Sequence, residues 1–135
     1  MDASARDRLR AIGTFVDELE NPAFVAGTWH RSERTREDPN VWTMPWFELS
    51  PRALAFVTAL GGLVTVFDWP AWAQTPEAQA LHDDRGVLAA ATLEDLTKLV
   101  TAVLREDRFV EGALGASFES GLMAAIARRA GALVE

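Results

Sequence analysis

The longest stretch without a charged side chain, Ala53 to Phe67, places the strongest constraint on how this chain can fold. From Ala53 to Leu60 apolar side chains cover nearly every side of a helix, so this helix is expected to be central and buried. A membrane-spanning helix needs about 20 predominantly apolar residues. This stretch is shorter, and Gly61-Gly62 interrupts it. The pattern therefore predicts a helix at the centre of a soluble core.

Length and composition favour one soluble domain over residues 1–135. Hydrophobic residues make up 49% of the chain and charged residues 24%, which is typical of a globular protein. The absence of cysteine excludes disulfides and thiolate chemistry, and two histidines, His30 and His82, are too few for a histidine-rich metal site. We therefore expect no metal site and no cofactor.

The charge balance bears on partners and location. Twenty acidic residues against thirteen basic ones give a net charge of -7, which opposes nucleic-acid binding because that binding needs a basic face. The first residues are charged and no apolar run follows them, unlike a secretory signal. The sequence predicts a cytoplasmic protein that binds neither nucleic acid nor membrane.

Helix-start signals recur along the chain as a polar cap followed by proline or by an acidic residue three positions on. Ser4 with Asp7 resembles a capping box, and Ser50-Pro51 places a capping serine before a proline. After Thr92 the apolar residues lie within a narrow arc of a helix. After Val110 a strict four-residue spacing drifts around any straight helix, so we expect two helices there. The predicted helices cover about residues 4–20, 51–60, 75–82 and 92–104, then a short helix from 108 and a terminal helix after 117, with a plain turn at 83–86.

A small sheet is predicted where the helical period disappears. Two apolar segments, Phe24 to Trp29 and Val41 to Phe47, flank a stretch of three basic and three acidic residues, which indicates a hairpin with a charged loop. Leu63 to Phe67 is short and partly β-branched, so it is a candidate third strand. The predicted fold class is α+β, mostly α, with about five helices packed with a two- or three-stranded antiparallel element.

The aromatic composition is unusual, with five tryptophans and no tyrosine. A tryptophan brings a large apolar area and one N–H that needs a partner, which suits both cores and binding grooves. The two interpretations are packing of the small sheet against helices and an aromatic-lined groove for a peptide or small ligand. All five lie between residues 29 and 72, and Trp42, Trp46 and Trp69 are the candidate ligand-binding residues.

A second cluster lies at the junction of two predicted helices, from Arg105 to Leu114. Arginine suits a bidentate grip on a carboxylate or phosphate, so Arg105 and Arg108 could bind an anion. The alternative is an ion-pair network that joins the helices. We expect both arginines to be at least partly buried and paired with Asp107, Glu111 or Asp68.

Three carboxylates could in principle support acid–base chemistry: Glu48, Asp68 and Glu111. Asp68 lies between Phe67 and Trp69, where an apolar environment would raise its pKa, although aspartate in such a setting is also a common cap or turn residue. No phosphate-binding glycine loop, nucleophile elbow or metal-ligand spacing is present. No catalytic residue can be assigned.

Several short motifs taken together resemble a bacterial domain family that is known only as a domain of unknown function. They are Met44-Pro45-Trp46-Phe47-Glu48-Leu49-Ser50-Pro51 followed by Phe56, then Phe67-Asp68-Trp69, then Arg105-x-x-Arg108-Phe109-x-Glu111-Gly112-x-Leu114 with Gly121 beyond. The similarity covers roughly residues 15–130. It implies a small, helix-rich intracellular bacterial protein, and it implies no activity, cofactor or catalytic residue.

Two functional hypotheses remain. The first is a non-enzymatic binding or interaction module with a Trp-rich groove for a protein or small-molecule partner. The second is a small enzyme that uses Asp68, Glu48 or Glu111 with an arginine as anion clamp. An enzyme needs carboxylates that converge with an arginine in one concave site, whereas a binding module needs an exposed aromatic face.

The C-terminal apolar residues also suggest self-association. The series from Val110 to Ala130 winds around the predicted helix pair, which would leave apolar surface exposed in a monomer. A homodimer with a two-fold axis would cover it. The alternative is that the terminal helix is central and buried within its own domain.

Overall fold

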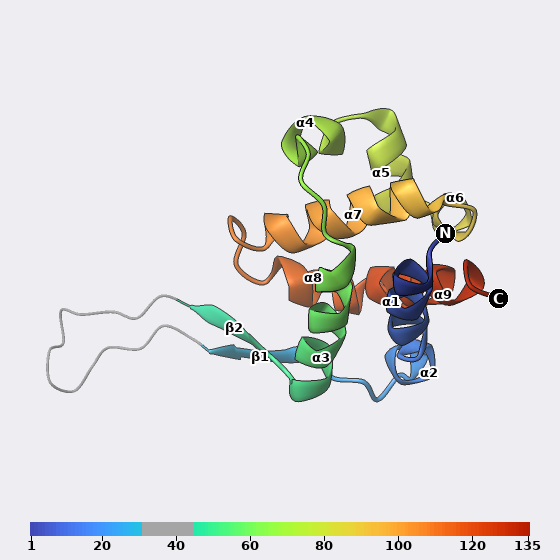
Figure 1. Cartoon of the computed structure of the whole chain (residues 1–135). Helices are drawn as coiled ribbons and strands as arrows, with labels where there is room; N and C mark the ends of the chain where they lie inside the picture. Colours follow the sequence, from blue (N-terminus) through green and yellow to red (C-terminus); the bar gives the residue numbers. More distant parts are fainter. Residues whose placement is uncertain (31–44) are drawn as a thin grey trace, which may run out of the picture.

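The computed structural model describes residues 1–30 and 45–135, which form a stack of helices from which a hairpin projects (Figure 1). Helices α4 and α5 lie above α7, and α7 lies above α8 and α9, with α1 packed on α9. The described part contains α1 (Ala3–Gly13), α2 (Val16–Glu20), α3 (Pro51–Leu60), the 3-10 helix η1 (Gly61–Leu63), α4 (Trp69–Ala73), α5 (Pro76–Asp83), α6 (Arg85–Ala89), α7 (Leu93–Glu106), α8 (Ala113–Glu119), α9 (Leu122–Ala132) and the strands β1 (Gly27–His30) and β2 (Trp46–Leu49).

Helix α3 lies at the centre of the core, as its apolar surface predicts. Ser50 caps it by accepting a hydrogen bond from the Ala53 N–H at 3.2 Å. The Phe56 side chain is fully buried. Its ring forms edge-to-face contacts with the rings of Phe15 and Phe118, whose centroids lie 5.3 Å and 5.9 Å away. Phe56 thus joins α3 to the N-terminal and C-terminal parts of the chain.

Helix α9 is the second central element. Its buried residues pack into one core with α1, α6, α7 and α8, and they are Leu122, Met123, Ile126, Ala127 and Ala130. Most of the apolar series that suggested a homodimer, including Leu114, Leu122, Ile126 and Ala130, is therefore buried within the chain itself, whereas Val110 is 51% exposed. Because several helices surround α9, its apolar residues do not need to keep to one face.

Two glycines, Gly13 and Gly131, face each other where α1 packs on α9. A Cβ atom on Gly13 would lie 2.8 Å from the Gly131 Cα, whereas a Cβ on Gly131 would lie 3.6 Å from the Gly13 Cα, an ordinary contact. The first distance is too short for any real Cβ, and the neighbouring atom is backbone that cannot rotate away. The two glycines therefore differ in their tolerance of a methyl group.

We expect Gly13→Ala to lower the free energy of unfolding by about 1–3 kcal/mol because it forces α1 away from α9. Gly131→Ala should leave it unchanged or raise it by up to about 1 kcal/mol, since alanine favours a helix over glycine. Urea denaturation of the two variants measures the difference. Equal stabilities would contradict the close approach.

The hairpin of β1 and β2 confirms the predicted antiparallel element. The strands pair with Gly27 opposite Leu49 and Trp29 opposite Phe47. A methyl group on Gly27 would lie 2.1 Å from the Glu48 carbonyl oxygen, so the strands are this close only because the residue is glycine. The charged loop predicted between the strands lies in residues 31–44, outside the described part.

The prediction of a third strand at Leu63 to Phe67 is wrong. Leu63 ends the 3-10 helix η1, and the residues after it are irregular. The Thr65 N–H donates to the Thr101 hydroxyl on α7 at 3.1 Å instead of to a neighbouring strand. Val66 is 97% exposed, so this β-branched residue does not belong to a buried strand.

Several helix boundaries differ from the predicted ones, and the helix predicted over about residues 4–20 is divided into α1 and α2. Asp2 rather than Ser4 caps α1, accepting from the Ala5 N–H at 2.7 Å. Residues 83–86 do not form a plain turn, because the Asp84 side chain accepts from the Gly86 N–H at 2.9 Å and begins α6. Helix α8 begins at Ala113 and not near residue 108. Within the described residues, no helix combines the length and apolar character needed to span a membrane.

Candidate functional site

The described tryptophans lie in two places and do not form one groove. Trp29 and Trp46 belong to the hairpin, where both are about half exposed. Trp69 and Trp72 belong to α4, and Trp72 packs against the core with its ring edge-on to a phenylalanine. Trp42 lies outside the described residues. The two places define separate candidate surfaces.

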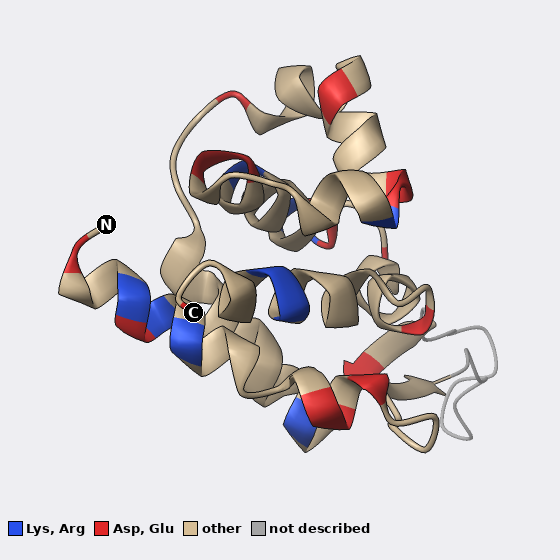
Figure 2. Ribbon diagram, turned by 90° about the vertical axis from the view of Figure 1, so that its right-hand side faces the viewer, with Lys and Arg blue, Asp and Glu red and all other residues tan. Residues whose placement is uncertain are grey.

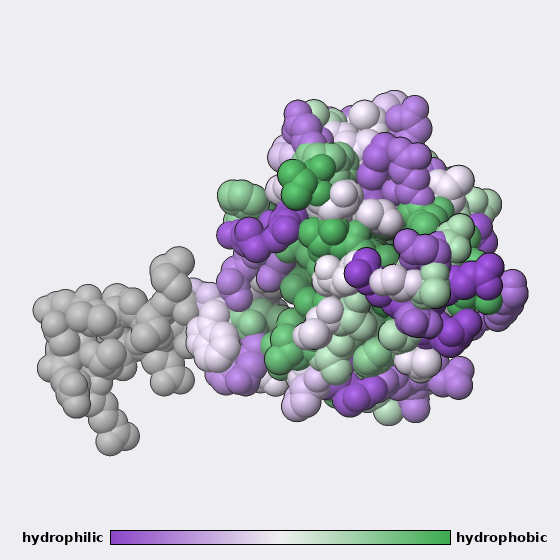
Figure 3. Space-filling model, viewed as in Figure 1, coloured by the Kyte–Doolittle hydropathy of each residue, from purple (hydrophilic) through white to green (hydrophobic). Residues whose placement is uncertain are grey.

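The first surface is a groove between α4 and the end of α7, which we call the α4–α7 groove. Its volume is about 650 Å³, within the range of small-ligand and peptide sites. In Figure 3 hydrophobic and strongly hydrophilic residues lie side by side over the α7–α8 junction. The groove is lined by Trp69 and Pro70 of α4, Arg105 and Glu106 of α7, and Arg108, Phe109 and Val110 of the junction.

Local chain geometry places the aromatic side chains of the groove. Asp68 caps α4 by accepting from the Ala71 N–H at 3.3 Å, which sets Trp69 on the first turn of a short helix. The chain leaves α7 after Glu106, so Phe109 is not held on a helix face. The Trp69 and Phe109 rings lie 6.2 Å apart between centroids. Phe109 is nevertheless 78% exposed, and Val110 is 51% exposed.

The arginines of the groove correct a prediction. Arg105 is half-buried and Arg108 is exposed, and neither forms an ion pair with a carboxylate of the described residues. The expected partners bond backbone N–H groups instead. Asp107 accepts from Leu114 at 3.1 Å and Glu111 accepts from Phe47 at 2.7 Å, while Asp68 is the cap of α4. The expected ion-pair network is therefore wrong.

The second surface is a smaller cavity of about 340 Å³ beside the hairpin. The sequence-derived candidates Trp46, Glu48 and Glu111 line it together with Asp107. Glu48 lies 3.1 Å from the Nε2 atom of His30, and the His30 ring stacks on Trp46 with 4.2 Å between centroids. These polar groups thus bond one another and the backbone.

Two glycines hold the hairpin against the α7–α8 junction. Gly112 has a φ of +83°, and a Cβ atom there would lie 2.3 Å from the Trp29 ring. A Cβ on Gly115 would lie 2.7 Å from the Phe47 ring. With the Glu111 hydrogen bond to Phe47, these contacts fix the hairpin and the junction as one unit.

The structure divides the candidate residues between two surfaces. Trp69, Arg105 and Arg108 share the α4–α7 groove, whereas Glu48 and Glu111 line the hairpin cavity. The enzyme hypothesis requires Glu48, Asp68 or Glu111 to converge with an arginine in one concave site. None of these three carboxylates lines the groove that holds Arg105 and Arg108, so the structure gives the hypothesis no support. Across residues 1–30 and 45–135, no group of three or more His, Asp or Glu side chains could hold a metal ion.

Four groove residues were not among the sequence candidates: Pro70, Glu106, Phe109 and Val110. Phe109 and Val110 are the two that carry the exposed apolar surface. Both follow Arg108 directly, beyond the apolar arc of the helix that opens at Thr92. This position was the available signal. Adjacent apolar residues that do not belong to the apolar face of a predicted helix are candidates for exposure to solvent. The signal was overlooked because Val110 also fits the four-residue spacing of the apolar series from Val110 to Ala130.

Comparison with protein families assigns the whole of this architecture to one group. The model of a family of unknown function, DUF6508, matches residues 4–135. The chain belongs to this family. The DUF6508 match includes every residue of the α4–α7 groove and of the hairpin cavity, and it agrees with the resemblance to a domain of unknown function. Searches of curated proteins and of solved structures gave no match.

Proposed function

We propose that this protein is a non-enzymatic interaction module of the bacterial cytoplasm that binds a segment of a partner protein in the α4–α7 groove. The segment would present an apolar side chain beside a carboxylate. The observation that carries the proposal is the exposure of Phe109, 78% of whose surface faces solvent beside Trp69 and two arginines.

The apolar part of the groove supports an apolar anchor on the partner. Trp69 and Phe109 form an aromatic pair at its wall, and Val110 adds exposed aliphatic surface. Large exposed apolar groups that lie together commonly mark an interaction site, whereas single ones do not. Tryptophan and arginine are also the residues most enriched among those that dominate binding energy.

The charge of the groove supports an acidic partner. Arg105 and Arg108 outnumber Glu106, in a chain whose net charge is -7. Their guanidinium groups make no ion pair with the described carboxylates, so their N–H donors can bind a carboxylate of the partner. Figure 2 shows Lys and Arg spread over several helices with acidic residues among them, which favours a protein partner over nucleic acid.

Peptides selected from a random library on the purified protein test the proposal. We expect enrichment of an aromatic or aliphatic residue next to aspartate or glutamate. Phe109→Ala should weaken binding of a selected peptide about thirtyfold, the effect of losing a dominant contact. Arg108→Glu should weaken it as well and reduce its dependence on salt, because this position then repels the acidic residue while Arg105 still attracts it.

Val66→Ala is the matched control for Phe109→Ala. Val66 is another large apolar residue, 97% exposed and outside the groove, so its removal should leave peptide affinity unchanged. Selected peptides that lack the apolar and acidic pair would contradict the proposal. Equal affinity of the wild type and Phe109→Ala for these peptides would also contradict it.

A further inference from the structure

A third cavity lies along α9, separate from the α4–α7 groove and from the hairpin cavity. We call it the α9 cavity, and its volume is about 610 Å³. Three helices contribute to it: α2 with Glu20, α6 with Arg85 and Ala89, and α9 with its solvent-facing residues. The lining residues from α9 and its N-terminal cap are Gly121, Ala124, Ala125, Arg128, Arg129 and Ala132.

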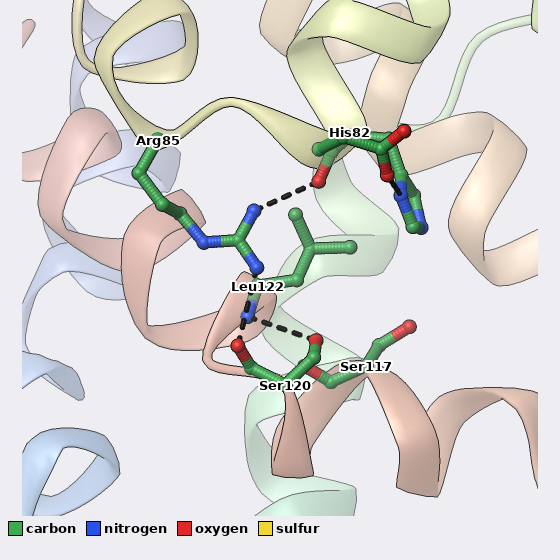
Figure 4. A network of polar contacts seen from close by, with 6 residues as sticks. His82, Arg85, Ser117, Ser120 and Leu122 are labelled. Carbon is green, nitrogen blue, oxygen red and sulfur yellow. Dashed lines mark hydrogen bonds and ion pairs between the residues drawn. The ribbon is translucent and has the colours of Figure 1, made fainter.

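Arg85 is held in place by carbonyl groups. One Nη atom donates to the His82 carbonyl oxygen at 2.8 Å, and the other donates to the Ser120 carbonyl oxygen at 3.2 Å. Figure 4 shows the guanidinium group between these two oxygens, with the Leu122 N–H bonded to the Ser120 hydroxyl below it. The side chain thus spans the end of α5 and the end of α8, and its guanidinium is pre-positioned.

Arg129 is held in the same way. Its Nε donates to the Ala91 carbonyl oxygen at 2.7 Å, and the residue is half-buried. A guanidinium group has five N–H donors. Arg129 uses one of these on a carbonyl and Arg85 uses two, so both keep donors that can bind an anion.

The charges around the cavity do not cancel. Arg128 pairs with Glu20, which is the only carboxylate in the lining. Arg85 and Arg129 bond carbonyls, and in the described part of the chain no carboxylate forms an ion pair with either. Two positive charges therefore remain at this cavity in a protein whose net charge is -7.

The remaining lining is apolar. Ala89, Ala124, Ala125 and Ala132 bring methyl groups from α6 and α9, so the floor has no hydrogen-bonding side chain. The alanine side chains are short, so they leave space between the longer arginine side chains. A ligand that fits has an anionic group for the arginines and a short hydrocarbon part for the alanines.

We propose that the α9 cavity binds a small organic carboxylate with a short apolar body. The volume lies within the range of small-molecule sites, and the two fixed guanidinium groups supply donors without further ordering of their side chains. Arginine forms parallel hydrogen bonds to a carboxylate, which fixes the orientation of such a ligand. This site is independent of the α4–α7 groove.

Hexanoate tests the proposal, with acetate and hexan-1-ol as partial probes. Isothermal titration should show that hexanoate binds at least about tenfold more tightly than either one, because only hexanoate satisfies both the arginines and the alanine floor. Amide chemical shifts should change most over residues 121–132. Equal binding of acetate would mean that only a nonspecific anion is bound, and equal binding of hexan-1-ol would mean that charge has no role; either result overturns the proposal.

Variants of the cavity charges give effects of opposite sign. Arg85→Gln should weaken hexanoate binding about tenfold, because it removes a charge and its hydrogen bonds. Glu20→Gln should strengthen it about threefold, because Arg128 then has no competing carboxylate. Glu20 is exposed, so this second variant should fold normally.

Glu18→Gln is the matched control for Glu20→Gln. Glu18 lies on the same short helix α2 and pairs with Arg52 of α3, whose Nε donates to it at 2.9 Å. Both substitutions remove one negative charge and one ion pair, but Glu18 does not line the α9 cavity. We expect hexanoate affinity to stay unchanged in Glu18→Gln. Equal tightening in the two variants, or no tightening in Glu20→Gln, would overturn the proposal.

Discussion

Phe56→Ala is expected to lower the free energy of unfolding by about 3–5 kcal/mol, the largest effect of any substitution considered for this fold. Phe56 is fully buried at the centre of α3. Its ring contacts Phe15 and Phe118, so the cavity left behind would separate the N-terminal and C-terminal parts of the core. Neighbouring helices cannot close such a cavity fully, which adds to the lost burial.

Urea denaturation followed by tryptophan fluorescence measures this effect. Val66→Ala is the control, since Val66 is almost fully exposed and its truncation should change the free energy of unfolding by no more than about 0.5 kcal/mol. A loss below about 1 kcal/mol for Phe56→Ala would contradict the central position of α3.

Gly112→Ala is expected to have the second largest effect on stability, a loss of about 2–5 kcal/mol. The left-handed backbone at φ +83° disfavours any residue with a Cβ by about 1–2 kcal/mol. The new methyl group would also overlap the Trp29 ring at 2.3 Å, which adds the cost of displacing the hairpin.

Gly121→Ala separates the two contributions to this loss. Gly121 has a nearly identical φ of +84°, and no atom lies within 4 Å of the Cβ that alanine would add. We expect only the backbone cost there, about 1–2 kcal/mol. The difference between the variants should disappear when Trp29→Ala is present in both. Equal losses in the presence of Trp29 would contradict the contact between hairpin and junction.

The local parts of the fold could be predicted from the sequence because they depend on neighbouring residues. Ser50 caps the helix that it was expected to cap, and Thr75 and Thr92 cap helices at the positions where the predicted ranges begin. The hairpin was recognisable from its two apolar segments. The mostly helical α+β class follows from these local signals, and six helices of seven residues or more are present in the described part.

Features that depend on contacts distant in sequence could not be predicted. The Asp107 and Glu111 carboxylates were expected to pair with arginines, yet each satisfies a backbone N–H group, and Glu111 reaches one on β2. Local sequence shows which side chains carry charge but not which distant donors lack a partner. The same limit applies to Leu63 to Phe67. This segment has the composition of a strand, but it does not pair with either strand of the sheet.

The candidate site was predictable in part. Residue type alone indicated Trp69, Arg105 and Arg108, which the structure brings to one groove. Their separation from Glu48 and Glu111 depends on how α4 folds over α7, and no sequence pattern reports it. The α9 cavity was missed because its arginines come from α6 and α9, which meet only in the folded chain.

Amide chemical-shift mapping with a selected peptide tests the central claim, that the α4–α7 groove is the interaction surface. The peptide carries an apolar residue next to an acidic one, and the full chain is titrated with it. The account predicts that the largest shift changes occur at residues 69–70 and 105–110, and that they are lost in Phe109→Ala. Changes centred on the hairpin strands 27–30 and 46–49, with residues 105–110 unaffected, would contradict it.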